Sequence, residues 1–172
     1  WGLKSNTRVF RSAFTGYIQA QETPGALWTC TYSYPLLTDE YMRIFKAWIL
    51  KLRGQANAFP ARDFVFKGGA NTGNTATATK GADIVIFNSA VNLKAGDYIG
   101  VDDELKAVVE DADNVTQVRI EPPFRKDHTN AVVAFEYPAC NMVLDVDSVK
   151  WQSVSPNLSS LEFSGTEVFV NP

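Results

Sequence analysis

The chain has 172 residues, of which 45% are hydrophobic and 20% charged, and its formal net charge is -3. A chain of this length can bury a core without metals or disulfides, and its composition excludes intrinsic disorder. The acidic balance argues against a nucleic-acid-binding protein, which usually has a strong basic excess. No apolar run approaches the roughly 20 residues that cross a bilayer, so we expect no membrane partner.

The first predicted elements are strands. Residues 9–14 and 17–22 are separated by Thr15-Gly16, and Pro24-Gly25 predicts a type II turn, because glycine accepts the positive φ that this turn requires. Residues 28–34 then alternate between two kinds of side chain, which predicts a strand with two different faces. One face carries Trp28, Cys30, Tyr32 and Tyr34, and the other carries Thr29, Thr31 and Ser33. We expect this strand to end at Pro35, because proline cannot donate to a strand ladder.

An amphipathic helix is predicted next, over residues 39–53. Thr38 is a suitable N-cap, and Asp39 and Glu40 place negative charge in the first turn, where the helix dipole favours it. Gly54 fits the position that follows a helix C-terminus. The apolar residues fall on one helical face, made of Tyr41, Phe45, Trp48, Ile49 and Leu52. An aromatic strand ending at Phe66 follows.

Residues 68–81 are small, polar and rich in glycine and threonine, which predicts a flexible linker. Short strands with frequent turns follow it and favour a small antiparallel barrel. The candidate strands are residues 83–87, 98–101, 105–109, 115–120, 131–137 and 141–144. The predicted fold is therefore mainly β (α+β): a sheet-and-helix domain of residues 1–67 with 141–172, and an inserted linker and barrel of residues 68–140.

No catalytic, cofactor-binding or metal site is predicted, and the chain is not expected to be an enzyme. His128, the single histidine, lies in a polar, turn-like segment, and the sequence nominates no partner for it, so we interpret it as a solvated loop residue. One histidine and two distant cysteines lack the spacing of a zinc site. Cys30 and Cys140 are expected to be buried thiols, although the sequence leaves a disulfide between them open.

The acidic run Asp102-Asp103-Glu104 lacks the ligand order of an EF-hand and is interpreted as a solvated or subunit-facing edge. The basic residues of the predicted helix are expected to meet solvent or an acidic neighbour. The residues that we select as interface candidates are Trp28, Tyr32, Tyr34, Arg43, Lys46, Asp102, Asp103 and Glu104.

The order of motifs resembles the minor tail proteins of long-tailed bacteriophages. In the first half these motifs are Gly-Tyr-x-Gln at 16–19, Pro-Gly-Ala-x-Trp at 24–28, Pro-Leu at 35–36, and Arg-Gly-Gln-Ala at 53–56 after the helix. In the second half they are Leu-Lys-Ala-Gly-Asp-Tyr-Ile-Gly at 93–100, Glu-Leu-Lys at 104–106, Glu-Pro-Pro-Phe-Arg at 121–125, Ala-Val-Val at 131–133 and Cys-Asn-Met at 140–142. The resemblance covers most of the chain and lies in the order of the motifs.

This resemblance implies a distal tail, or tail-tip hub, protein: a structural virion protein at the tail tip, assembled in the host cytoplasm. Such proteins form a six-fold ring that joins the tail tube to the baseplate hub around the channel through which DNA passes. The implied partners are further copies of the chain, the tail tube protein, the tail-tip hub protein and the tape measure protein, with DNA only as passing cargo. The family supplies no catalytic residues.

Two other classes stay open at this stage. Aromatic residues such as Tyr98 and Trp151 on a small β-domain would suit a carbohydrate-binding module that serves host attachment. A small hydrolase is the weakest alternative, because His128 has no partner that the sequence identifies.

Overall fold

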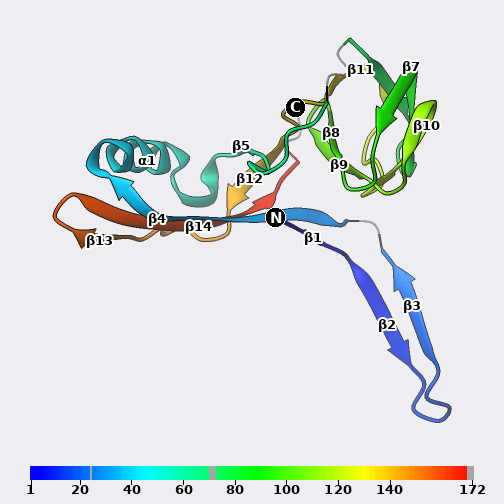
Figure 1. Cartoon of the computed structure of the whole chain (residues 1–172). Coiled ribbons are helices and arrows are strands. Elements are labelled where there is room, and N and C mark those ends of the chain that lie inside the picture. Colours follow the sequence, from blue (N-terminus) through cyan, green and yellow to red (C-terminus); the bar gives the residue numbers. More distant parts are fainter. Residues whose placement is uncertain (24, 70–72, 170–172) are drawn as a thin grey trace. The chain divides into compact units, whose positions relative to one another are not determined.

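The computed structural model describes residues 1–23, 25–69 and 73–169, and its fold is mainly β with one α-helix and a closed antiparallel barrel (Figure 1). The chain divides into two compact units. The first contains residues 1–4, 27–61 and 141–172, and the second contains residues 5–26 and 62–140. Residues 5–26 and 62–67, which the sequence analysis assigned to the sheet-and-helix domain, thus group with the barrel.

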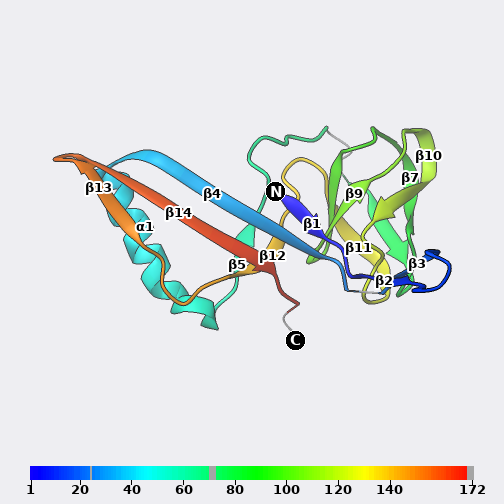
Figure 2. The same ribbon diagram turned by 90° about the horizontal axis from the view of Figure 1, so that it is seen from below.

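The first unit is built on one sheet in the order β1-β4-β14-β12-β5, with β13 paired to β14. Its strands are β1 (Gly2–Lys4), β4 (Leu27–Thr38), β5 (Phe59–Ala61), β12 (Cys140–Leu144), β13 (Trp151–Ser155) and β14 (Leu158–Glu167). β4 and β14 run side by side along most of their lengths (Figure 2), with Tyr32 opposite Phe163 and Cys30 opposite Gly165. This pairing joins segments that are separated in sequence by the whole barrel.

The predicted alternation in β4 is confirmed, but the strand does not end at Pro35. It continues to Thr38, and its register against β14 shifts between Tyr34 and Leu37. Two residues of β4, Pro35 and Leu36, oppose one residue of β14 at this shift. A bulge of this kind leaves a residue outside the ladder, which is where a strand accepts a proline without losing a hydrogen bond.

The predicted helix is confirmed as α1 (Asp39–Leu52), although its buried face is rotated from the expected one. Met42, Ile49 and Leu52 are buried, whereas Tyr41 is 59% exposed. At its C-terminus Arg53 and Gly54 both have positive φ, and a 3-10 turn follows over Gly54–Ala56. A Cβ on Gly54 would lie 2.7 Å from a carboxylate oxygen of Asp147, so this position needs glycine for space as well as for conformation.

Aromatic rings fill the space between α1 and one face of the sheet. Tyr34 lies 4.8 Å from Phe45, and Trp48 lies 5.3 Å from Phe163 and 5.1 Å from Phe59, measured between ring centroids. Rings at these separations and inclined to one another add favourable contacts to the burial of their apolar area. The first unit is therefore a two-layer structure in which α1 covers a single face of the sheet (Figure 1).

Both cysteines are buried free thiols, as expected. The Cys30 Sγ lies 3.2 Å from the Sδ of Met142 on β12, the second strand along from β4 in the same sheet. Burial raises the pKa of the Cys30 thiol, which keeps it protonated and weakly reactive.

The second unit begins with a hairpin of β2 (Thr7–Arg11) and β3 (Ile18–Glu22), which pair with Val9 opposite Ala20 and form a sheet of their own. The loop between the strands is longer than the two residues expected. The predicted turn at Pro24-Gly25 includes Pro24, which lies outside the described residues, and Gly25 has a φ of 121°.

The rest of the second unit is a closed barrel in the order β10-β7-β6-β11-β8-β9. Its strands are β6 (Thr75–Ala78), β7 (Ile84–Leu93), β8 (Tyr98–Val101), β9 (Glu104–Val108), β10 (Ala112–Glu121) and β11 (His128–Ala134). The linker prediction was wrong for residues 75–78, which form β6, and residues 70–72 lie outside the described part of the chain. The core consists of inward-facing apolar residues from these strands, including Val85, Phe87, Ile99, Val118 and Ile120, together with Phe135 just after β11.

Neighbouring positions of α1 give a test of its orientation. We expect Met42→Ala to lower the free energy of unfolding of the first unit by about 2–5 kcal/mol, because it removes a buried side chain and leaves a cavity. Tyr41→Ala, on the exposed side, should change it by less than about 0.5 kcal/mol. Urea unfolding followed by tryptophan fluorescence measures this, since the four tryptophans of the chain all lie in this unit. Equal losses for the two variants would contradict the orientation.

Candidate functional site

Four ionisable side chains meet at one end of the barrel, and we call them the ionic cluster: Asp102, Glu104, Lys106 and His128. Asp102 lies in the turn between β8 and β9, Glu104 and Lys106 lie on β9, and His128 begins β11. Glu104 and Lys106 are each 1% exposed and His128 is 2% exposed. Glu104 and Lys106 are two residues apart on one strand, so their side chains leave the same face.

The cluster is held together by short polar contacts. The Lys106 Nζ donates to Glu104 Oε2 at 2.6 Å. The His128 Nε2 lies 3.1 Å from Glu104 Oε1, and its Nδ1 lies 2.9 Å from Asp102 Oδ2. Glu104 therefore bridges a lysine and a histidine, and His128 bridges two carboxylates.

The segment between β10 and β11 closes the cluster. The Arg125 backbone N–H donates to both carboxylate oxygens of Glu104, at 3.1 and 3.3 Å, and Lys106 Nζ donates to the Pro123 carbonyl at 3.2 Å. The ring of Phe124 lies 4.8 Å from Lys106 Nζ and 5.1 Å from the His128 ring. Each buried charge thus has several partners, as the cost of removing it from water requires.

Burial by itself raises the pKa of Glu104, because it disfavours the charged form. The hydrogen bond and charge of Lys106, the hydrogen bond to His128 and the Arg125 N–H more than offset this effect, so the pKa lies below its usual value of 4.5. Glu104 is therefore ionised at neutral pH.

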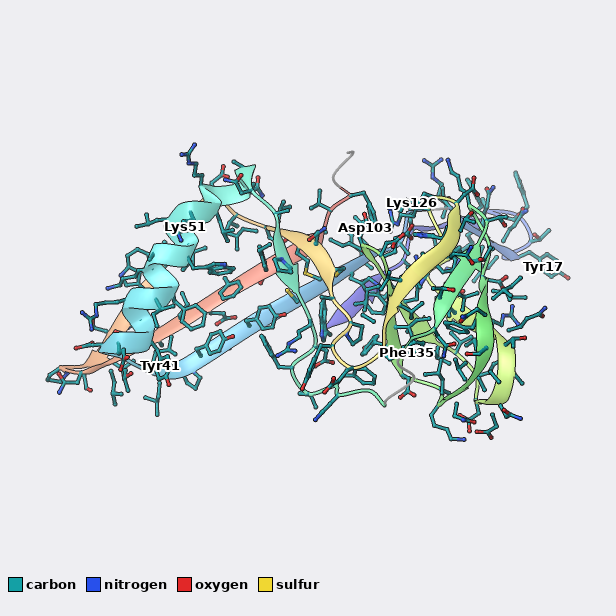
Figure 3. The ribbon with its side chains drawn as sticks, turned by 90° about the horizontal axis from the view of Figure 1, so that it is seen from above. Tyr17, Tyr41, Lys51, Asp103, Lys126 and Phe135 are labelled. Atoms are coloured by element: carbon teal, nitrogen blue, oxygen red, sulfur yellow. The ribbon has the colours of Figure 1, made fainter. Side chains whose placement is uncertain are left out.

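A second ion pair lies beside the cluster, where Lys126 Nζ is 2.5 Å from Asp103 Oδ1 (Figure 3). Partial burial raises the pKa of Asp103, but the hydrogen bond and charge of Lys126 outweigh it and the pKa is lowered. The same hydrogen bond raises the pKa of Lys126. This pair is half-exposed, and its contribution to stability is correspondingly small.

The structure corrects two sequence interpretations at this site. His128 is a buried strand residue with two carboxylate partners and not a solvated loop residue. Glu104 belongs to the barrel interior and is not available to another subunit, whereas Asp102 and Asp103 reach the surface. The acidic residues farther along the chain lie at the surface, where Lys94 Nζ is 3.3 Å from an oxygen of Asp111 and 2.9 Å from an oxygen of Asp113.

The cluster has the composition of a structural network. The contacts described for His128 join it to carboxylates and to Phe124, with no hydroxyl or thiol nucleophile among them. Within residues 1–23, 25–69 and 73–169, no group of three or more histidine, cysteine or acidic side chains is arranged to hold a metal ion. Lys106 already occupies the position beside Glu104 that a cation would take.

The other predicted interface residues divide between the core and the surface of the first unit. Trp28 is buried, and Tyr32 and Tyr34 are half-buried against Phe163, 5.3 and 6.4 Å away, so they pack beneath α1. Arg43 is exposed on α1, and Lys46 lies over the ring of Trp151 at 5.2 Å. Tyr98, the other aromatic residue considered for sugar stacking, packs against Phe66 at 5.2 Å.

The sheet of the first unit has a second face, not covered by α1, and an open strand edge. Sequence reasoning identified neither of them. Residues opposite each other in the ladder share a face, so Thr29, Thr31 and Ser33 of β4 lie on one side with Glu162, Ser164 and Thr166 of β14. The Thr31 and Ser164 hydroxyls are 3.1 Å apart. Beside β4, the pairing described for β1 reaches only Leu27 to Thr29, which leaves the edge of residues 30–38, here called the β4 edge, without a described neighbour.

The β2–β3 hairpin also carries apolar side chains at the surface. Phe14 is fully exposed at its loop and Tyr17 is 80% exposed, and the strands add three further exposed residues, Val9, Phe10 and Ile18. Exposed apolar groups in such number on one element are typical of an interaction surface.

No protein-family model matches the chain, and no curated protein matches it either. In the described part of the chain, the helical segments are too short or too polar to cross a bilayer.

The buried ion pair and the surface ion pair allow a matched test. We expect Lys106→Met to lower the free energy of unfolding of the barrel by about 3–5 kcal/mol, because it leaves the Glu104 charge buried without its main partner. Lys126→Met removes a lysine from the exposed pair and should cost less than about 1 kcal/mol. Denaturation followed by circular dichroism measures both, and similar losses would show that the cluster is not the stabilising element.

Acid should weaken the barrel through Glu104. Because its pKa is lowered in the folded state, its contribution to stability is present above the usual value of 4.5 and is lost as the pH falls through the lower folded value. We expect the unfolding free energies of the wild type and Glu104→Gln to converge as the pH falls from about 7 to about 3. Glu110→Gln, which alters an exposed carboxylate of the same barrel, is the control, and a Glu104→Gln difference that does not vary with pH would contradict the assignment.

Proposed function

We propose that the chain is a structural protein of a bacteriophage tail that assembles into a ring, hexameric in the proposed form, joining the tail tube to the tail-tip hub around the DNA channel. The observation that carries the proposal is the two-faced sheet of the first unit, which is covered by α1 on one side and has an open edge at β4. The motif order from Gly16 to Met142 supports the same assignment by resemblance.

The uncovered face of this sheet suits the wall of a channel through which DNA passes. Along the paired positions 29–33 of β4 and 162–166 of β14, this face carries hydroxyl groups, and Glu162 is its charged residue. A wall without cations in these positions offers no ion pairs to phosphate groups, so DNA could slide past it. The net charge of -3 also disfavours attraction of the chain to phosphate groups.

The β4 edge provides the contact between copies. An unpaired strand edge presents N–H and C=O groups that can pair with a strand from another chain. When the donor and acceptor surfaces differ, the contact is heterologous, and its repetition gives a ring when the rotation between copies closes. The bulge at Pro35 and Leu36 would then set how far along β4 a neighbouring strand can pair.

Assembly of the purified chain tests this proposal. Mass photometry and negative-stain imaging should show a closed ring for the wild type. Leu36→Lys, which places a charge on the β4 edge where Leu36 is 64% exposed, should leave the chain folded but monomeric.

Val132→Lys is the matched control, since Val132 is 73% exposed on the barrel and takes no part in the β4 edge. It should assemble like the wild type. A strictly monomeric wild-type chain would contradict the proposal, as would a ring whose channel wall is strongly basic.

A further inference from the structure

The β2–β3 hairpin has no covering layer among the described residues. Its strands form a two-stranded sheet of their own (Figure 1), and residues 7–21 are exposed throughout. A hairpin without a third strand or a helix packed against it is marginally stable in water. The apolar side chains that it carries therefore indicate a surface outside the chain against which the hairpin is buried.

These apolar side chains surround the loop end of the hairpin. The ladder places Val9 and Ile18 on one face of the ribbon and Phe10 on the other. Phe14 and Tyr17 lie in the loop, where they are 100% and 80% exposed, and Tyr17 can be followed in Figure 3. A partner protein with a defined surface covers one face of a ribbon, whereas a lipid bilayer surrounds an inserted tip on all sides. The distribution of apolar groups therefore favours a bilayer.

The backbone of the loop satisfies its own hydrogen bonds. The Ser12 N–H donates to the Tyr17 carbonyl at 2.9 Å, and the Gly16 N–H donates to the Ser12 carbonyl at 3.0 Å. The Thr15 N–H donates to the Ser12 hydroxyl at 3.2 Å. Lipid offers no partners to backbone polar groups, so a segment that enters it must pair them internally. These three N–H groups meet that requirement.

The charge of the hairpin is opposite to that of the whole chain. Residues 7–21 contain Arg8 and Arg11 and no aspartate or glutamate, whereas the chain has a net charge of -3. The two arginines are three residues apart on β2, so they lie on opposite faces of the ribbon, with Arg8 about 10 Å farther from the loop. Cations on both faces behind an apolar loop match the negative headgroups that surround an inserted tip.

We propose that the loop of the β2–β3 hairpin inserts into the interface of a lipid bilayer that contains anionic phospholipids. Phe14 and Tyr17 enter the boundary between headgroups and acyl chains, about 5–10 Å deep, and Arg8 and Arg11 bind lipid phosphate groups. The expectation of no membrane partner rests on the lack of an apolar run that spans a bilayer, and a loop that enters only the interface needs no such run. Insertion does not depend on ring assembly, because a single copy exposes the same loop.

Flotation with vesicles tests the insertion. The wild-type chain should float with phosphatidylcholine vesicles that contain about 30% phosphatidylglycerol and should stay at the bottom of the gradient with pure phosphatidylcholine. Salt at about 1 M, where the Debye length is about 3 Å, should reduce the floated fraction. Absence of flotation, or equal flotation with both kinds of vesicle, would overturn the proposal.

Substitutions separate the loop from the rest of the surface. Phe14→Ser should weaken vesicle binding by at least about tenfold, because it removes apolar area that enters the lipid. Arg8→Gln and Arg11→Gln should each weaken binding about fivefold. Phe64→Ser is the matched control and should bind like the wild type, since Phe64 is 63% exposed in the same unit but lies outside the hairpin. Equal losses for Phe14→Ser and Phe64→Ser would overturn the proposal.

A fluorescent variant reports the position of the loop directly. The four tryptophans of the chain lie in the first unit, so Tyr17→Trp adds one at the loop. Vesicles of the same anionic composition with brominated acyl chains should quench this added emission and leave that of the wild type unchanged. No difference in quenching would overturn the proposal. It is also overturned if the wild type does not float and Phe14→Ser lowers the oligomeric state measured by mass photometry, because the hairpin then contacts another copy of the chain.

Discussion

The antiparallel pairing of β4 with β14 is the interaction on which the first unit depends. It brings residues 29–38 against residues 158–166 and closes a loop that contains α1 and the whole barrel. Closing a loop of this length costs chain entropy, which rises slowly with loop length. The long ladder and the aromatic rings packed beneath α1 offset that cost. Three other strands of this sheet, β1, β12 and β13, pair directly with one of these two strands, and β5 joins through β12.

The two units use different means to define their interiors. In the first, rings such as Trp48 and Phe163 provide apolar area between a helix and a sheet. In the second, an apolar core is joined by a polar network whose partners must all be present. Such a network specifies one arrangement of strands more strictly than apolar packing does, because any slip leaves a buried charge unpaired.

Sequence reasoning found the elements with strong local signals and missed those decided by distant contacts. The helix from Asp39 and the alternation in β4 were predictable, since spacing and capping fix them locally. The inward position of His128 was not predictable. Side chains alternate between the two faces of a strand, so regular alternation from the buried Ala131 would place residue 128 on the outer face. The register shift between His128 and Ala131, with Asn130 at positive φ, reverses that placement. The alternation of Glu104 and Lys106 on one strand face was the available signal for the cluster.

The Thr-Ala repeat of β6 has the composition of a linker, yet core packing restricts which residues it can contain. Ala76 is fully buried and lies opposite Phe87 in the ladder, and the Phe87 ring is 5.7 Å from that of Phe135. Ala76 belongs to the same closely packed core as the two rings, so a larger side chain at this position would overpack it. Substitutions that are neutral in a linker are therefore destabilising here, and a larger residue at position 76 calls for a smaller one elsewhere in this core.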